Sequence, residues 1–88
     1  MTTVSVTAAD IKNGIRFDCC HCPVALALRR AFPGRTFSVG NSRVWVDNKL
    51  LVALPEAVVE LRDRFDYGEK VEPIVFEIDL EPQQKGQK

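Results

Sequence analysis

The sequence contains no long apolar run and few cysteines, and both features exclude classes of protein. No apolar stretch approaches the ~20 residues that a membrane-spanning helix needs, so we expect a soluble protein with no membrane contact. The first five residues lack the basic segment and apolar stretch of an export signal, which predicts a cytoplasmic location where thiols stay reduced. The cysteine count of three is odd, which argues against a disulfide framework.

The groups on which most enzymes depend are also missing. The chain has a single histidine, His21, and shows no Ser-His-Asp set, no glycine-rich loop for a phosphate and no metal-binding cluster of carboxylates. Hydrolysis by a cysteine and a histidine needs two side chains that the fold brings together, and neighbours in sequence rarely face each other. We therefore expect a protein without enzymatic activity.

Charge is distributed unevenly along the chain although its formal net value is zero. Residues 12–49 carry seven bases and two acids, whereas residues 50–81 carry three bases and nine acids. If the fold keeps these sets on separate faces, the resulting dipole would orient the molecule toward a charged partner or a second copy. If the two halves pack together, the charges cancel locally.

Hydrophobic periodicity divides the chain into strands and helices. Apolar and polar residues alternate around Val4 and again over residues 74–80, as in half-buried strands. Thr7 is a predicted helix cap, and Cys22 before a proline is another, because proline suits the first helical position. The predicted strands are residues 4–6, 36–39, 43–46, 49–53 and 74–80, the predicted helices are residues 8–14, 24–32 and 55–68, and a short extended piece is expected at 15–17.

This order of elements predicts an α+β fold. We expect a single small domain over residues 1–81, with a mainly antiparallel sheet of four to five strands and two main helices packed on one face. Tight-turn compositions at residues 40–42 and 47–48 predict that the three central strands form a meander. Residues 82–88 contain no apolar side chain to bury and are predicted to be a disordered C-terminal tail.

All three cysteines and the histidine lie in the run Cys19-Cys20-His21-Cys22. Cys19 and Cys22 have the two-residue gap that lets one turn present two thiolates to a zinc ion, with His21 or Cys20 as a third ligand. No second cluster exists, so we expect no complete zinc site within one chain and no cofactor, although two chains together would supply four thiolates.

Two other interpretations apply to the same run. Cys19 and Cys22 before a helix resemble the C-x-x-C motif of thiol-disulfide oxidoreductases, in which the helix N-terminus lowers a thiol pKa. The proline after Cys22 starts the helix beyond the last cysteine, which departs from that motif. In the structural interpretation, Cys20 or Cys22 packs beneath the helix as a small apolar residue while His21 lies at the surface.

Two groups of residues are candidate binding surfaces. Arg29, Arg30, Arg35 and Arg43 are predicted to surround the end of the helix at 24–32, where they would contact the phosphates of a nucleic acid or nucleotide, or simply be solvated. Trp45 should point to the opposite strand face from its valine neighbours, on the side of Arg43 and Asp47. Tryptophan and arginine are enriched at protein-binding hot spots, so this face predicts a protein partner, and exposed strand edges would support a homodimer.

Four segments carry a resemblance to small proteins of unknown function from actinobacteria and their phages. They are DCCHCPVALALRRAFPG at residues 18–34, SVG at 38–40, LPEAVVELRDRFDYGE at 54–69 and PIVFEIDL at 73–80. The resemblance implies an accessory role inside a bacterial cell. We therefore expect a phage-type protein that acts by binding a protein, such as a host factor, with nucleic-acid binding and a zinc or dithiol role for Cys19 and Cys22 as alternatives.

Overall fold

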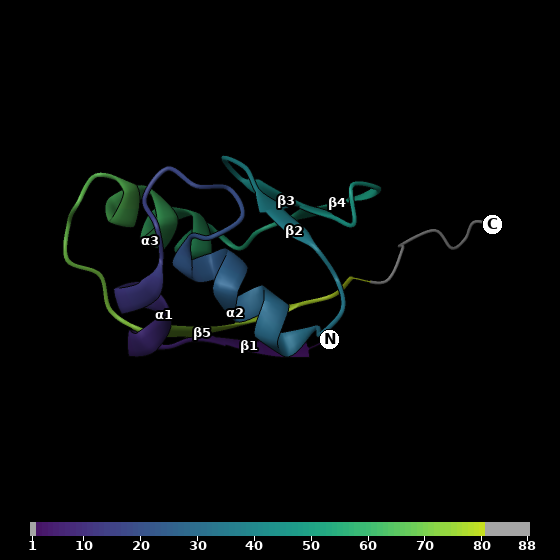
Figure 1. Cartoon of the computed structure of the whole chain (residues 1–88), viewed down its shortest axis with the longest axis horizontal. Helices are drawn as coiled ribbons and strands as arrows, with labels where there is room; N and C mark the ends of the chain where they lie inside the picture. Colours follow the sequence, from purple (N-terminus) through teal and green to yellow (C-terminus); the bar gives the residue numbers. More distant parts are fainter. Residues whose placement is uncertain (1, 81–88) are drawn as a thin grey trace.

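The computed structural model of the chain describes residues 2–80 (Figure 1). Its elements are β1 (Thr2–Val6), α1 (Ala8–Asn13), α2 (Pro23–Ala31), β2 (Phe37–Val39), β3 (Arg43–Val46), β4 (Leu50–Ala53), α3 (Glu56–Asp66) and β5 (Ile74–Ile78). The predicted α+β class is confirmed, with α2 and α3 as the two main helices. No helix in this part of the chain is long and apolar enough to cross a membrane. The predicted tail at residues 82–88 lies outside the described residues.

The five strands form two antiparallel sheets, whereas the sequence predicted one. β1 pairs with β5, so that Val4 lies opposite Phe76 and the two ends of the described chain are neighbours. β2, β3 and β4 form the predicted meander in a second sheet. Turn compositions indicate pairing between consecutive strands, but they do not indicate which sheet the two terminal strands join.

Helix α2 lies between the two sheets and explains why they are separate (Figure 1). It packs against β1 and β2 as well as against α1 and α3. Its buried residues are Pro23, Val24, Ala25, Ala27 and Leu28. Ala25 is fully buried, because α2 is covered from two sides and not from one.

The core is formed by one face of each sheet together with α2 and α3. Alternate residues of the β1–β5 sheet point into the core, among them Val6 and Ile78, as the alternation predicted. Val44 and Val46 point inward from β3, while Trp45 between them faces outward. The three-stranded sheet therefore has one face in the core and one face toward solvent.

The predicted helix caps are confirmed. The Thr7 hydroxyl accepts a hydrogen bond from the Asp10 N–H, and the Asp10 carboxylate accepts one from the Thr7 N–H, which together form a capping box. The Cys22 sulfur accepts a hydrogen bond from the Ala25 N–H, and Pro23 occupies the first turn of α2. Cys22 is thus a structural residue that fixes where α2 begins.

The segment between α1 and α2 departs from the prediction. Residues 15–17 do not form an extended piece, because the chain turns there and Phe17 adopts a φ of +60°. The Phe17 N–H donates a hydrogen bond of 3.0 Å to Asp66 Oδ1, and the Ile15 N–H donates one of 2.8 Å to the His21 carbonyl oxygen. These bonds hold the segment in a compact loop against α3.

Candidate functional site

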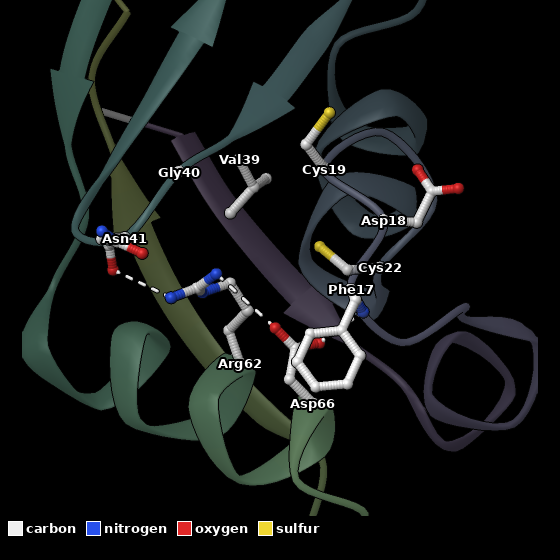
Figure 2. A pocket seen from close by; sticks show the side chains of 9 residues that line it. All are labelled: Phe17, Asp18, Cys19, Cys22, Val39, Gly40, Asn41, Arg62 and Asp66. Carbon is white, nitrogen blue, oxygen red and sulfur yellow. Dashed lines mark hydrogen bonds and ion pairs between the residues drawn. The ribbon is translucent and has the colours of Figure 1, made fainter.

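A hollow of about 230 Å³ opens between the loop that precedes α2, the end of β2 and helix α3 (Figure 2). Phe17, Asp18, Cys19 and Cys22 line it on one side, and Arg62 and Asp66 line it on the side of α3. Gly40 and Asn41, in the β2–β3 turn at residues 40–42, also line it. The fold thus places the cysteine run beside an ion pair that lies at least 40 residues away in the sequence.

Arg62 and Asp66 form the floor of this hollow. Arg62 Nη1 lies 3.6 Å from Asp66 Oδ2, and both side chains are largely buried. Arg62 Nη2 also donates hydrogen bonds to Asp63 Oδ1 at 2.7 Å and to the Asn41 carbonyl oxygen at 3.3 Å. Arg62 Nε is buried and has no hydrogen-bond partner within residues 2–80. Since Asp66 also accepts the Phe17 N–H, the pair joins α3 to both the loop and the β2–β3 turn.

The three cysteines occupy different environments. Cys19 is exposed, Cys20 is half-buried and Cys22 is buried beneath the start of α2. The sulfur atoms of Cys19 and Cys20 lie 3.3 Å apart, although adjacent side chains were expected to point in different directions. The metal-ligating atoms that the structure brings within 4.8 Å of one another belong to Asp18, Cys19 and Cys20. The prediction was Cys19 and Cys22 with His21 or Cys20 as a third ligand, whereas the observed set lacks Cys22 and His21 and includes Asp18.

The surroundings of the thiols shift their pKa values in opposite directions. A hydrogen bond with the Ser38 side chain, and then one with Cys20, lowers the pKa of Cys19. The contact with Cys19, followed by burial, raises the pKa of Cys20. Burial raises the pKa of the Cys22 thiol. The thiolate is the reactive and metal-binding form of cysteine. Of the three thiols, Cys19 is therefore the one that loses its proton at the lowest pH.

Asp18 organises the backbone of the loop. Its Oδ1 accepts hydrogen bonds from the N–H groups of Cys20 at 2.9 Å and His21 at 3.1 Å. The Cys20 bond is the largest cause that lowers the pKa of Asp18, so this carboxylate is ionised at neutral pH. His21 is exposed as predicted, with Nδ1 3.1 Å from the same oxygen. Arg29 donates to the Cys20 carbonyl oxygen at 3.5 Å.

Two of the four arginines predicted to form a basic surface are paired with acids. Arg30 makes two hydrogen bonds of 2.7 Å to the carboxylate of Asp10. Arg35 Nε donates one of 2.9 Å to Asp47 Oδ2. Their charges are therefore balanced locally, although both acids lie outside the acidic segment at residues 50–81. The nucleic-acid alternative consequently has fewer free cations than the sequence suggested.

Trp45 lies on the outer face of the meander, as the strand alternation predicted. Its side chain is 45% exposed, and it lies directly opposite Leu51 on β4, which is 40% exposed. Together with Arg43 and the β2–β3 turn, these side chains line a second hollow of about 280 Å³. The Arg43 guanidinium makes no hydrogen bond or ion pair within residues 2–80.

Sequence reasoning missed Leu51, Arg62 and Asp66 as site residues. A signal for the last two was present, because opposite charges four positions apart on a helix form a pair. Leu51 could also have been found, since the meander sets the strand register and places it beside Trp45. No local signal indicated that Asp66 would hold the loop at Phe17.

No known protein family matches this chain, and no curated protein or solved structure shows detectable similarity to it. Function is therefore inferred from the two hollows alone. The first offers an exposed thiol and clustered ligand atoms, and the second offers exposed apolar surface beside a guanidinium that has no partner among the described residues.

Proposed function

We propose that the chain is a protein-binding module that recognises its partner through the outer face of the β2–β3–β4 sheet. The observation that carries this proposal is the pair of Trp45 and Leu51, which lie opposite each other and stay 45% and 40% exposed. Exposed apolar side chains gathered beside polar ones are typical of protein interaction sites. Tryptophan and arginine are also the residue types most enriched at binding hot spots, and Arg43 shares this face.

Charge on this face favours a partner segment with an apolar anchor and acidic neighbours. Asp47 is the only acidic residue between residues 35 and 53. Its carboxylate already accepts hydrogen bonds from the Arg35 side chain and the Thr36 N–H. An incoming carboxylate would therefore find the Arg43 guanidinium without a competing acid from residues 35–53, whereas a basic segment would be repelled.

Strand β4 supplies backbone groups for such a segment. It is the last strand of the meander, and no strand within residues 2–80 pairs with its outer edge. An extended peptide adds to an exposed edge through main-chain hydrogen bonds, while alternate side chains provide specificity. The hollow of about 280 Å³ beside Trp45 would receive the apolar anchor of the peptide.

The remaining predictions from the sequence are parts of this proposal. The module would act without catalysis, in the cytoplasm, and as an accessory protein of phage type whose partner is a host protein. The odd number of cysteines supports a compartment that keeps thiols reduced. The phage setting is supported only by the resemblance of the four segments between residues 18 and 80.

Selection from a random peptide library displayed on yeast, with the full chain as bait, tests the proposal. We expect enriched peptides to carry a large apolar residue flanked by Asp or Glu. Their affinity, measured by calorimetry, should fall at least about tenfold for Trp45→Ala and for Arg43→Glu, because truncating a hot spot costs about 2 kcal/mol or more. The matched controls Tyr67→Ala and Lys70→Glu change an exposed aromatic and an exposed base in the segment between α3 and β5, and they should bind as the wild type does.

Two results would contradict the proposal. One is enrichment of the same peptides by the Trp45→Ala variant, or enrichment of basic peptides. The other is a dimer in analytical ultracentrifugation that Trp45→Ala dissociates, because a second copy would then occupy the face in place of a different protein. A monomer in both variants, together with the expected peptide selection, supports it.

A further inference from the structure

The loop between α1 and α2 brings three potential metal ligands together. The sulfur atoms of Cys19 and Cys20 and a carboxylate oxygen of Asp18 all lie within 4.8 Å of one another. We propose that these three side chains bind one thiophilic divalent cation, with Zn²⁺ as the reference ion. This site goes beyond the protein-binding face at Trp45 and does not depend on it.

The separation of the two sulfur atoms suits a shared ion. They lie 3.3 Å apart, whereas two thiolates on one tetrahedral zinc ion, each at about 2.3 Å, lie about 3.8 Å apart. A small side-chain rotation therefore reaches coordination distance. A disulfide fits less well, because adjacent Cα atoms lie about 3.8 Å apart and disulfides usually span about 4.4–6.8 Å. The geometry thus favours an ion over a bond between the two sulfur atoms.

The backbone that carries the cluster is fixed at both ends. The Cys19 carbonyl oxygen accepts a hydrogen bond of 2.8 Å from the Val39 N–H on β2. The His21 carbonyl oxygen accepts one of 2.8 Å from the Ile15 N–H across the loop. An incoming ion would therefore meet ligands that are already positioned, which lowers the entropy lost on binding.

Neighbouring groups complete the surroundings of the site. Asp18 Oδ1 accepts the Cys20 N–H and lies 3.1 Å from His21 Nδ1, so Oδ2 is the oxygen without a hydrogen bond within residues 2–80. Metal-binding carboxylates are commonly held by such hydrogen bonds from an outer shell. Arg29, which donates to the Cys20 carbonyl oxygen, places a positive charge near three anionic ligands.

The site is open to solvent on one side. Cys19 is exposed, and three protein ligands leave the fourth position of a tetrahedral ion to water. Cys22 does not take that position, because its sulfur accepts the Ala25 N–H and its residue is only 2% exposed. The two-residue spacing of Cys19 and Cys22 therefore does not define the site.

Titration of the reduced, full chain with Zn²⁺ against a chromophoric chelator tests the proposal. We expect one ion per chain, counted by native mass spectrometry of the same samples. Cys19→Ser and Cys20→Ser should each weaken binding by more than about 100-fold, since even outer-shell partners are worth about 10- to 100-fold in affinity. Cys22→Ser is the matched control and should bind as the wild type does, because serine also caps helices.

Several outcomes would overturn the proposal. These are no binding by the wild type, one ion shared by two chains, or loss of binding in Cys22→Ser but not in Cys20→Ser. Far-UV circular dichroism establishes that each variant is folded. Co²⁺ then reports the ligands through its thiolate charge-transfer absorption, which should weaken in a folded Cys20→Ser variant; unchanged absorption there would also contradict the ligand set. Binding of the selected peptides at Trp45 should be the same with and without Zn²⁺.

Discussion

The two hollows share the β2–β3 turn but are built in opposite ways. In the first, Arg62 and Asp66 are largely buried, and each bonds to a different segment of the chain. In the second, Trp45 and Leu51 are exposed, and the Arg43 guanidinium has no partner within residues 2–80. Buried polar groups that are already bonded hold a fold together, whereas exposed and unbonded groups are free to contact a partner.

The first hollow also separates two roles along its own rim. Cys22 begins helix α2 from a buried position, while Cys19, three residues earlier, is exposed beside Asp18 and Cys20. Stability and reactivity therefore belong to different residues of one short loop.

The largest effect should distinguish Cys19 from Cys22. In metal-free protein, iodoacetamide should alkylate Cys19 more than about 1000-fold faster, because the buried Cys22 reacts only when the domain opens. The pKa of Cys19 is lowered and that of Cys20 is raised, so the rate at Cys19 should level off at the lower pH. Peptide mapping by mass spectrometry follows both rates. Similar rates for Cys19 and Cys22 in the native protein would contradict the prediction, because they would show that the start of α2 is open to solvent. In the control, protein unfolded in urea, the two rates should be similar.

A second prediction concerns the floor of the first hollow. Asp66→Ala should lower the free energy of unfolding by about 3 kcal/mol, because it leaves the buried guanidinium of Arg62 and the Phe17 N–H without this carboxylate. Asp63→Ala removes the exposed partner of the same arginine and should cost less than about 1 kcal/mol. Urea denaturation followed by circular dichroism measures both. Equal losses of unfolding free energy would contradict the prediction, because the buried Asp66 would then contribute no more stability than the exposed Asp63.

A third prediction compares Arg30 and Arg43, which the sequence assigned to one basic surface. The hydrogen bond with Arg30 is the largest cause that lowers the pKa of Asp10 below 3.8. A lowered pKa in the folded state adds stability above the unfolded pKa, and that stability is lost as the pH falls through the folded pKa. Asp10→Asn should therefore destabilise the protein by about 1–2 kcal/mol at pH 7, and by progressively less below about pH 4.

Arg43→Gln provides the control for this comparison. Since its guanidinium has no partner within residues 2–80, the substitution should change stability by less than about 0.5 kcal/mol at every pH. Thermal unfolding at a series of pH values measures both variants. A loss of stability for Arg43→Gln as large as that for Asp10→Asn would contradict the prediction, because Arg43 would then stabilise the fold and would not be free to contact a partner.

The parts of the fold that the sequence predicted correctly have local causes. Thr7 and Cys22 cap their helices through groups three residues away, and alternation over residues 74–80 places the buried side of β5. Trp45 was assigned to the outer face by the same alternation. Such features depend on residues within a few positions along the chain, so they can be predicted from the sequence pattern.

The parts that the sequence did not predict depend on distant contacts. Arg30 reaches Asp10 across 20 residues, which removes it from the expected basic surface. Phe17 bonds to Asp66 across 49 residues, so the expected extended piece is a turn. The division into two sheets follows from the position of α2, which no local pattern specifies. The close approach of Cys19 and Cys20 likewise requires a backbone that β2 holds in place.

Substitution of Phe17 gives the smallest predicted effect. It tests whether this exposed residue helps to hold the first hollow together. It is 75% exposed with a φ of +60°, a conformation that asparagine tolerates better than a bulky side chain does. Phe17→Asn keeps the N–H that Asp66 accepts, so it should stabilise the protein by about 0.5–1 kcal/mol. Phe17→Gly should gain less, because glycine also increases the entropy of the unfolded chain. If both variants are destabilised in urea, the ring shields the pair of Arg62 and Asp66 from water, and Phe17 belongs with the residues that hold the first hollow together.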